Sequence, residues 1–388
     1  MSLRRRILFS IIVAALFFGG LEGGLRLHDF SFYVNFNADL LGMPLLDLTR
    51  LRRIANRTVT HDRRVFWRFK PNQVLADPEV YRRPVRINNQ GFRGADFALA
   101  KPAGTFRILC LGDSTTFGWS VADDETYPFQ LEKLLRERYP GRPVQVLNLG
   151  VTGYTSLQGR ELFRSENFRP DLVVFAFGPN DRLPALMSDA EHLAAGTWQI
   201  SPLAAALSRL QVFKLLRAGV VYLERRRQGL SLDPKTFLPR LKRKVSQTEF
   251  AENAAAVGRG ANALAAGFIV LNVDFPSLPR DHVYMNLREQ AEKSGVALSP
   301  AWTFWDSEAV ARQTADALHA PWLDLRGLFA GALKDAHASG ENLPDPDWQY
   351  LMIDNGHPNA RGHRLIAEEL LGLIEAAPQF RRFAGTAP

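Results

Sequence analysis

Five short apolar runs, each followed by a stretch with helical periodicity, constrain the fold of this chain most strongly. The apolar runs cover residues 106–112, 144–150, 171–178, 267–273 and 320–325. None of them alternates apolar with polar residues, which is typical of strands in a parallel sheet that is covered on both faces. The helical stretches cover residues 126–139, 155–168, 249–267, 306–319 and 360–377. This alternation predicts an α/β fold with a doubly wound, parallel, five-stranded sheet.

Composition narrows the class of protein further. The chain has 388 residues, of which 46% are hydrophobic and 23% are charged, so it is neither disordered, collagenous nor a coiled coil. Its one cysteine, Cys110, excludes an intramolecular disulfide, a cysteine-based zinc site and a lipoprotein anchor near the amino terminus. Because Cys110 falls inside an apolar run, we expect it to pack as a small hydrophobic residue.

The amino terminus has the pattern of a membrane-targeting segment. Arginines at positions 4–6 precede 15 uncharged residues, 7–21, which Glu22 and Arg26 follow. A spanning helix needs roughly 20 apolar residues, so the length is marginal, but no A-x-A cleavage site follows the run. We favour a signal-anchor over a cleaved signal peptide. The basic start then places the bulk of the chain outside the cytoplasm, on the periplasmic side of a bacterial inner membrane, or secreted if the segment is cleaved.

The net charge of +8 is unevenly distributed. Residues 1–104 carry 17 Lys/Arg against 8 Asp/Glu, and residues 224–244 carry eight against two. The rest of the chain is net negative, which disfavours nucleic-acid binding by a uniformly basic surface. The basic residues at 225–227 and 240–244 either face anionic lipid or acidic polysaccharide, or are a solvated helix end and loop.

These patterns divide the chain into three parts. Residues 1–26 form the anchor, residues 27–104 a juxtamembrane segment that packs on the main domain, and residues 105–380 the main domain. In the second part, Asn89-Gln90-Gly91 predicts a tight turn or small hairpin, and we expect the aromatic residues to serve packing. The main domain contains an insertion, residues 182–248, which could be a lid or binding surface, or a helical hairpin that covers the core.

A nucleophile and its base are suggested by two loops. Ser114 in LGDSTTFG follows the first strand, where doubly wound sheets bind ligands. Serine needs a base to take its proton, and His357 in IDNGHPNARGH has Asp354 three residues before it, which could fix the tautomer of the imidazole. Asn359 is placed to cap the last helix. We expect His363 to be a residue of that helix without a catalytic role, and Asp113 to shape the loop.

Oxyanion donors are suggested by the ends of the second and third strands. The loop NLGVTGYTS contains Gly153, which lets a backbone N–H approach a ligand closely, and FGPND presents the side-chain amide of Asn180. The carboxyl ends of parallel strands share one edge of the sheet, so we expect these loops to meet near Ser114.

In these motifs the chain resembles the SGNH hydrolases, or GDSL esterases and lipases, of the membrane-anchored bacterial type. GDSTTFG, NLGVTGYTS, GPND and DNGH resemble the four sequence blocks of the family in their order, over residues 106 to about 377. The resemblance implies a flavodoxin-like sheet with Ser114 as nucleophile, His357 as general base and acid, and Asp354 as its orienting carboxylate. It implies an oxyanion hole made by the Ser114 N–H, the Gly153 N–H and the Asn180 side chain, with Gly150 as a rival to Gly153. GDST stands here where the older consensus has GDSL.

The predicted activity is therefore that of a serine esterase or acylhydrolase on an acyl ester, such as an O-acetyl ester of a carbohydrate or a lipid ester. It implies no metal or organic cofactor. Two alternatives use the same chain differently: an envelope polysaccharide O-acetyltransferase with the same triad, and a non-enzymatic membrane-anchored scaffold.

Overall fold

A five-stranded parallel sheet organises the computed structural model, which describes residues 2–28, 58–77, 81–196, 202–207, 209–229 and 233–385. Its strands are β5 (Phe106–Gly112), β6 (Val144–Gly150), β7 (Leu172–Phe177), β10 (Gly267–Asn272) and β11 (Trp322–Asp324). They lie in the order β11-β10-β7-β5-β6, which is the flavodoxin-like order with β5 between β6 and β7. The predicted sheet is confirmed, and β5 and β6 have the predicted bounds.

The register places the ends of three strands side by side. Gly112, at the end of β5, pairs with Gly150 at the end of β6 and with Ala176 in β7. All three loops that follow these strands therefore leave the sheet at one edge. The chain order reverses direction at β5, and this is where doubly wound sheets form their ligand crevice.

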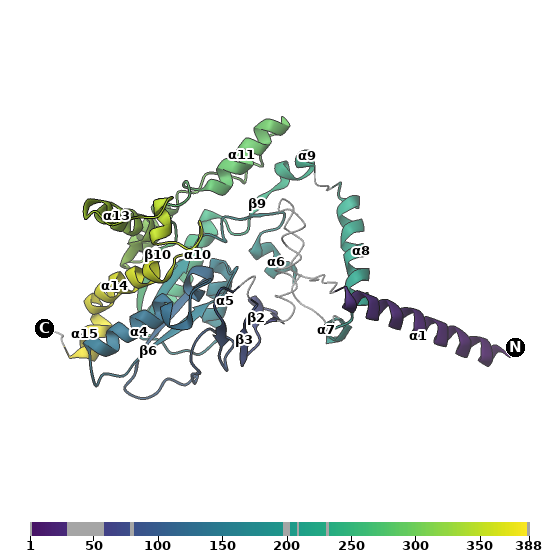
Figure 1. Ribbon diagram of the computed structural model, residues 1–388, viewed down its shortest axis with the longest axis horizontal. Helices are drawn as coiled ribbons and strands as arrows, with labels where there is room; N and C mark the ends of the chain where they lie inside the picture. The colour runs from purple at the N-terminus through teal and green to yellow at the C-terminus, as the bar shows by residue number, and fades with distance from the viewer. Residues whose placement is uncertain are drawn as a thin grey trace.

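Two groups of helices cover the two faces of the sheet (Figure 1). One face is covered by α4 (Tyr127–Arg138), α13 (Leu325–Ala338) and α14 (Ala360–Ala376). The other face is covered by α5 (Ser156–Ser165), α10 (Gln247–Ala263) and α12 (Ser307–Ala317). Each group buries its apolar stripe on a separate hydrophobic cluster, which explains why the strands lack polar alternation.

Among the described residues that follow the insertion, three α-helices lie outside the predicted stretches. Of these, α11 (His282–Ser294) has a mostly polar sequence, and α13 starts directly after β11 because Asp324 accepts hydrogen bonds from the N–H groups of Arg326 and Gly327. The third, α15 (Pro378–Ala384), follows the helix that we expected to be the last. Its Phe380 is fully buried against Phe106, with ring centroids 5.1 Å apart.

The segment before the sheet folds onto the main domain through two hairpins. Strands β1 (Val59–Asp62) and β2 (Phe66–Phe69) pair antiparallel, as do β3 (Gln73–Leu75) and β4 (Val85–Ile87). The predicted turn is present: Gly91, with φ of 80°, donates its N–H to the Asn88 carbonyl. Of the predicted juxtamembrane segment, residues 29–57 and 78–80 lie outside the described residues.

The described aromatic residues of this segment serve packing, as expected. Phe69 stacks on Phe117 of the main domain with ring centroids 5.3 Å apart. A buried arginine adds a polar contact, because Arg93 donates to the carbonyls of Phe117 (3.0 Å) and Val121 (2.7 Å). The segment thus holds the loop that follows Ser114.

The insertion is tied at both ends by a two-stranded sheet of β8 (Pro184–Ala185) and β9 (Lys242–Arg243). Between them lie α6 (Asp189–Ala195), α7 (Pro202–Leu207), α8 (Gln211–Arg227), α9 (Pro234–Phe237) and the 3-10 helix η2 (Leu238–Arg240). Residues 197–201, 208 and 230–232 are outside the described residues. Among the described residues of the insertion, α9 packs on α11, α8 packs on the amino-terminal helix, and Ala190 and Leu193 of α6 pack against the core.

One expectation for the basic segment is wrong. Arg243 does not face a partner, because its side chain is 3% exposed and its guanidinium lies 2.5 Å from the fully buried carboxylate of Asp281. It also stacks over the Trp302 ring, at 4.4 Å from the centroid. Desolvation would make an unpaired buried cation costly, so Arg243 holds the insertion to α11 in place of binding a ligand.

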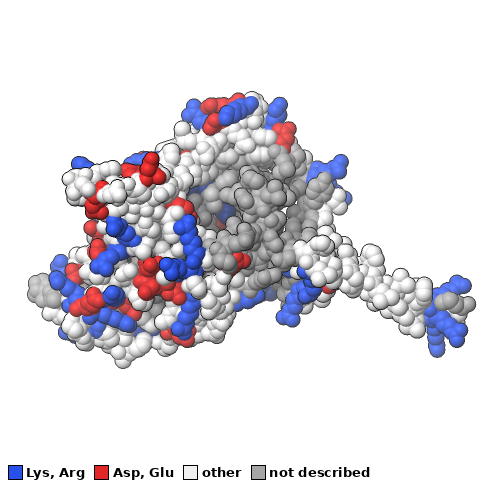
Figure 2. Space-filling view, in the orientation of Figure 1, with Lys and Arg blue, Asp and Glu red and all other residues white. Residues whose placement is uncertain are grey.

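The amino-terminal helix α1 (Leu3–Leu27) projects from the rest of the molecule (Figure 1). It is long and apolar enough to cross a membrane, and it is the one such helix among the described residues. Figure 2 shows it as a mostly uncharged rod whose free end carries the basic side chains. At its other end, Leu21–Leu25 are partly buried, whereas residues 3–20 are exposed.

Candidate active site

The geometry of the first strand–helix turn presents Ser114. Ser114 is the first residue of α3 (Ser114–Phe117), and Asp113 caps this helix by accepting the Thr115 N–H at 2.9 Å. Gly112 allows the turn, since a Cβ there would lie 1.9 Å from the Thr116 hydroxyl. Asp113 is therefore the loop-shaping residue that the sequence predicted.

Ser114, His357 and Asp354 form a continuous chain of hydrogen bonds. The Ser114 Oγ lies 2.9 Å from Nε2 of His357. Nδ1 of His357 lies 2.8 Å from Oδ1 and 2.9 Å from Oδ2 of Asp354. The His357 side chain is 26% exposed, so the arrangement is open to a substrate on one side. Such a chain can draw the proton from the hydroxyl while the carboxylate stabilises the imidazolium.

The loop of residues 353–359 is fixed by its own hydrogen bonds. Asp354 also accepts the Gly356 N–H at 2.8 Å, and Ile353 donates its N–H to the His357 carbonyl. Burial tends to raise the pKa of Asp354, but the hydrogen bonds and charge of His357 outweigh it and hold that pKa below its ordinary value. Asp354 is therefore ionised at neutral pH. Asn359 caps α14 as predicted, at 3.0 Å from the Arg361 nitrogen.

His363 belongs to the core. It is fully buried on α14, and its Nδ1 accepts the Tyr127 N–H at 3.2 Å. Burial, with smaller effects from Arg93 and His357, lowers its pKa to about 3, so the imidazole is neutral. His363 therefore packs in the core, which fits the expectation that it is a residue of the last predicted helix without a catalytic role.

Two backbone N–H groups near Ser114 are available to a ligand. Within the described parts of the chain, neither the Ser114 N–H nor the Gly153 N–H donates to a protein acceptor. Gly153 has φ of 82°, which favours glycine. The N–H of its rival Gly150 donates to Asn148 at 3.0 Å, and a Cβ there would lie 2.2 Å from the Phe117 nitrogen. Gly150 therefore serves packing, and Gly153 is the better placed donor.

The Asn180 side chain joins two of the loops. Its Nδ2 donates to the Tyr154 carbonyl at 3.1 Å and to Oδ2 of Asp113 at 3.3 Å. Both amide hydrogens are thus used in this state, and the bond to Asp113 is the longer one. Asp113 is fully buried, which raises its pKa to about 6.

Asp181, the residue after Asn180, is a second buried carboxylate near the site. Asp181 accepts the Ser156 N–H at 3.1 Å and pairs with the Ser156 hydroxyl, so it holds the first turn of α5. Burial raises the pKa of Asp181 to about 7 against these hydrogen bonds. Asp181 positions the chain that carries Asn180, a role that the sequence motif GPND did not reveal.

Three aromatic residues near the site were not predicted as part of it. The ring of Trp119 lies 5.9 Å from the His357 ring, and Tyr81 packs on Trp119 at 5.4 Å. A Cβ on Gly153 would lie 3.4 Å from the ring of Trp67, and Tyr154 donates its hydroxyl to the Trp67 carbonyl. None of them was predicted to lie at the site, although the position of Trp119, five residues after Ser114, could have indicated it.

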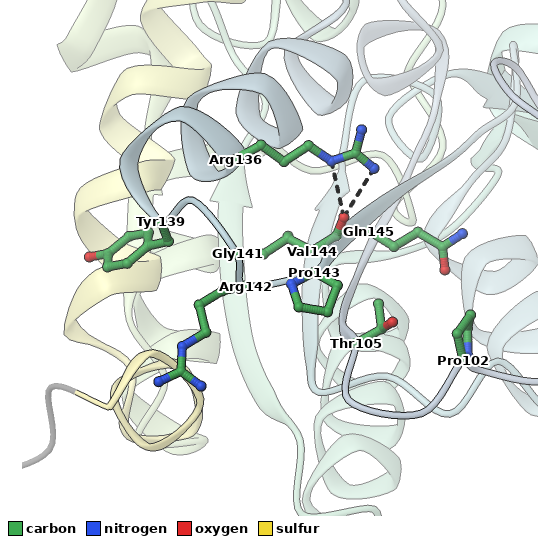
Figure 3. Close-up of a pocket in the computed structure, with 9 residues that line it drawn as sticks. All are labelled: Pro102, Thr105, Arg136, Tyr139, Gly141, Arg142, Pro143, Val144 and Gln145. Carbon is green, nitrogen blue, oxygen red and sulfur yellow. Dashed lines mark hydrogen bonds between the residues drawn. The ribbon is translucent and has the colours of Figure 1, made fainter.

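A pocket elsewhere on the sheet lies away from these residues. The pocket in Figure 3 is lined by Thr105 and Val144, at the amino-terminal ends of β5 and β6, and so lies at the opposite edge of the sheet. Arg136 closes one side of it by donating to the Val144 carbonyl at 3.3 and 3.4 Å. In the described ranges, no three His, Cys, Asp or Glu side chains cluster as metal ligands would.

Comparison with protein families shows the family of this chain. The family model described as the GDSL-like lipase/acylhydrolase family matches residues 110–365, which include all four motifs. This chain belongs to that family. The GDSL-like acylhydrolases are carboxylic ester hydrolases, and the chain is one of them. No curated protein sequence matches this GDSL-like acylhydrolase.

Solved structures also resemble this GDSL-like acylhydrolase. LAE5, an α/β hydrolase enzyme from the metagenome of Lake Arreo in Spain, is 17% identical with a TM-score of 0.38, over 74% of this chain and 98% of its own. Axe2, an acetylxylan esterase from Geobacillus stearothermophilus, is 18% identical with a TM-score of 0.37, over 72% and 94%. The acetyl xylan esterase AlAXEase is 13% identical with a TM-score of 0.38, over 69% and 100%.

Proposed function

We propose that this GDSL-like acylhydrolase is a serine esterase in which Ser114 is the nucleophile, His357 the general base and acid, and Asp354 the orienting carboxylate. One observation carries the proposal: the unbroken hydrogen-bonded chain of 2.9 Å from Ser114 to His357 and 2.8 Å from His357 to Asp354. The three side chains come from loops 240 residues apart in the chain, so local structure alone does not explain their alignment.

The reaction has two halves. In acylation, Ser114 Oγ bonds to the ester carbonyl carbon while Nε2 of His357 takes the hydroxyl proton. The tetrahedral intermediate collapses as His357 returns this proton to the leaving alcohol oxygen, and an acyl-serine remains. In deacylation, His357 takes a proton from water as the water oxygen attacks the acyl carbon. Collapse then returns the proton to Ser114 and releases the carboxylic acid.

The oxyanion of each tetrahedral intermediate needs donors that are already in place. We assign this role to the N–H groups of Ser114 and Gly153 and to the side-chain amide of Asn180. The first two are supported by their lack of a protein acceptor in the described parts of the chain. Asn180 can take part by sharing or exchanging its longer bond, the one of 3.3 Å to Asp113.

The nucleophile is tested by labelling with a fluorophosphonate probe. We expect the wild type to be labelled and to lose esterase activity in parallel, whereas Ser114→Ala takes up no label. Ser339→Ala is the matched control, because Ser339 is an exposed serine at the end of α13 and should be labelled like the wild type. Equal labelling of Ser114→Ala and the wild type would contradict the assignment.

The acyl group is tested with p-nitrophenyl esters of increasing chain length. A sharp preference for acetate indicates an O-acetyl ester of a carbohydrate, and a rise with chain length indicates a lipid ester. Adding an oligosaccharide acceptor to an acetyl donor separates hydrolysis, which releases acetate whatever the acceptor, from transfer to a sugar hydroxyl.

We also propose that α1 anchors the enzyme in a membrane, with the catalytic unit outside the cytoplasm. The apolar helix with arginines at its start supports this placement. In this division, residues 1–26 are the anchor, residues 27–104 the juxtamembrane segment and residues 105–380 the catalytic domain. Carbonate extraction of membranes, with sequencing of the mature amino terminus, tests it: an anchored protein stays in the pellet and keeps its first residues.

A further inference from the structure

An exposed apolar face on α8 has no counterpart in the catalytic machinery. Leu216, Val220 and Leu223 are 62%, 52% and 57% exposed. Their spacing of four and three residues puts them on one side of the helix. Leu203 in α7 and Leu210 before α8 are 69% and 42% exposed and extend this surface along the chain. A row of exposed apolar residues on one side of a helix, unlike a single exposed leucine, indicates a surface that binds an apolar partner.

The same helix is fixed to the end of α1. Glu22 accepts the N–H of Val212, in the first turn of α8, at 2.9 Å. Arg26 pairs with Glu22 at 2.7 Å and donates to the Arg209 carbonyl at 3.2 Å, which holds the chain that enters α8. A carboxylate at this position satisfies free N–H groups and favours the helix dipole. The start of α8 is therefore set where the apolar part of α1 ends.

The orientation of α8 matches a membrane surface. Figure 1 shows α8 running crosswise to α1 from the point where they meet. If α1 crosses a bilayer, a helix that runs crosswise at its end lies along the plane of that bilayer. Partial burial begins at Leu21, so the fully exposed part of α1, residues 3–20, is the part that lipid would surround.

The charges at the end of α8 fit the same partner. Arg226 and Arg227 are exposed, and Arg227 follows Leu223 by four residues and Val220 by seven, so it lies on the apolar side. Long basic side chains next to an apolar face are typical of helices that lie at the interface of a bilayer, where they reach anionic headgroups. An apolar row flanked by arginines fits a bilayer with anionic headgroups better than it fits a second, equally apolar protein surface.

We infer that α7 and α8 form an interfacial element that lies on the bilayer next to the anchor and holds the catalytic unit against the membrane surface. This inference rests on the proposed anchoring by α1. It gives the insertion a function that catalysis does not need: α1 tethers the enzyme, and α8 fixes its height and orientation, so that the substrate is an ester near the membrane face.

The experiment places a fluorescent NBD label at single cysteines of the full-length chain. Cys110 is fully buried, so the unmodified chain serves as the blank. Leu216→Cys and Leu223→Cys test α8, and Leu16→Cys reports on the anchor. Leu264→Cys is the matched control, because Leu264 is a leucine of similar exposure, 52%, at the end of α10. Labelling of Ser114 by the fluorophosphonate probe shows that each variant is folded.

Each labelled protein is reconstituted in vesicles of phosphatidylcholine and phosphatidylglycerol that carry a nitroxide quencher near the headgroup or deep in the acyl chains. We expect the labels at 216 and 223 to lose most of their fluorescence with the shallow quencher, and the label at 16 with the deep one. The label at 264 should keep its fluorescence with both quenchers.

The outcomes separate the inference from the anchoring on which it rests. If the label at 16 is quenched while those at 216 and 223 behave like the one at 264, the anchor stands and the interfacial element is overturned. If the labels on α8 escape the quenchers and shift to the blue as protein concentration rises, a second copy covers the face, which also overturns it. If no label is quenched, the anchoring fails as well.

Discussion

Asp354 holds the imidazole of His357 from only three residues away in the chain: Oδ1 of Asp354 lies 2.8 Å from Nδ1 of His357. The two residues share one loop, and its geometry is set by the backbone bond from Ile353 to His357. The proposed orienter and base are thus a local unit, whereas Ser114 lies 243 residues before His357 in the chain.

The first prediction removes the charge of Asp354. We expect Asp354→Asn to lower kcat by roughly 10²–10⁴-fold with a much smaller change in KM, because the imidazole loses its fixed tautomer and the partner of its positive charge. Steady-state kinetics on a p-nitrophenyl ester measures this. Asp347→Asn removes an exposed carboxylate that pairs with His337, and it should leave kcat unchanged. A similar kcat for both variants would remove Asp354 from the mechanism.

A second prediction concerns the left-handed backbone of Gly153. Gly153→Ala should lose roughly 1–2 kcal/mol of stability through strain at φ of 82°, and it should also lose activity because the N–H moves and the new methyl meets Trp67. Gly104→Ala is the control for strain alone, since its φ is 72° and a Cβ there meets nothing within 4 Å. Denaturant unfolding should give similar losses for both variants, with a fall in kcat for Gly153→Ala alone.

Asp113 is predicted to position Asn180. Asp113→Asn keeps an oxygen for the Thr115 N–H but turns an NH2 group toward the Asn180 amide, so the hydrogen bond from Asn180 to residue 113 is lost. We expect kcat to fall by roughly 10–100-fold, less than for loss of a whole oxyanion donor. A KM that stays constant separates this from a binding defect. If Asp113→Asn only shifts the melting temperature and leaves kcat intact, Asp113 is a helix cap and nothing more.

The buried Asp181 predicts a pH dependence of stability. Its pKa is raised to about 7 in the folded protein, so between its ordinary pKa and about 7 the folded state binds more protons than the unfolded state. Stability from this group therefore falls as pH rises through that window. Asp181→Asn does not titrate, so its deficit in melting temperature relative to the wild type should shrink between pH 5.5 and pH 8.5, values chosen roughly one to two units on either side of 7. A deficit that is constant or grows would contradict the raised pKa.

The buried ion pair of the insertion predicts a difference between two arginines. Arg243→Ala leaves the carboxylate of Asp281 buried without its partner, and should lower the free energy of unfolding by roughly 3–5 kcal/mol. Arg240→Ala removes an exposed arginine three residues earlier and should change it by less than about 0.5 kcal/mol. Equal effects in urea unfolding would show that Arg243 is not held as the structure has it.

Apolar runs and short motifs in the sequence predicted the central sheet and the family of this protein. The bounds of β5 and β6 follow from apolar runs, and the confirmed family follows from motifs in the loops after the strands, which are properties of neighbouring residues. The flavodoxin-like order is what the resemblance to that family implied, and the sheet has it. The pairing of Asp354 with His357 could be predicted as well, because the two residues are only three positions apart in one loop.

The tertiary structure decided what depends on residues far apart in the chain. The sequence could not show that Trp67 lies under Gly153, that both amide hydrogens of Asn180 are engaged, or that Arg243 is buried. Nor could it place Glu22 at the start of α8, 190 residues away. Periodicity records only which face of an element is apolar. Which partner covers that face, and which charge is buried with it, depends on packing between elements that the local pattern does not contain.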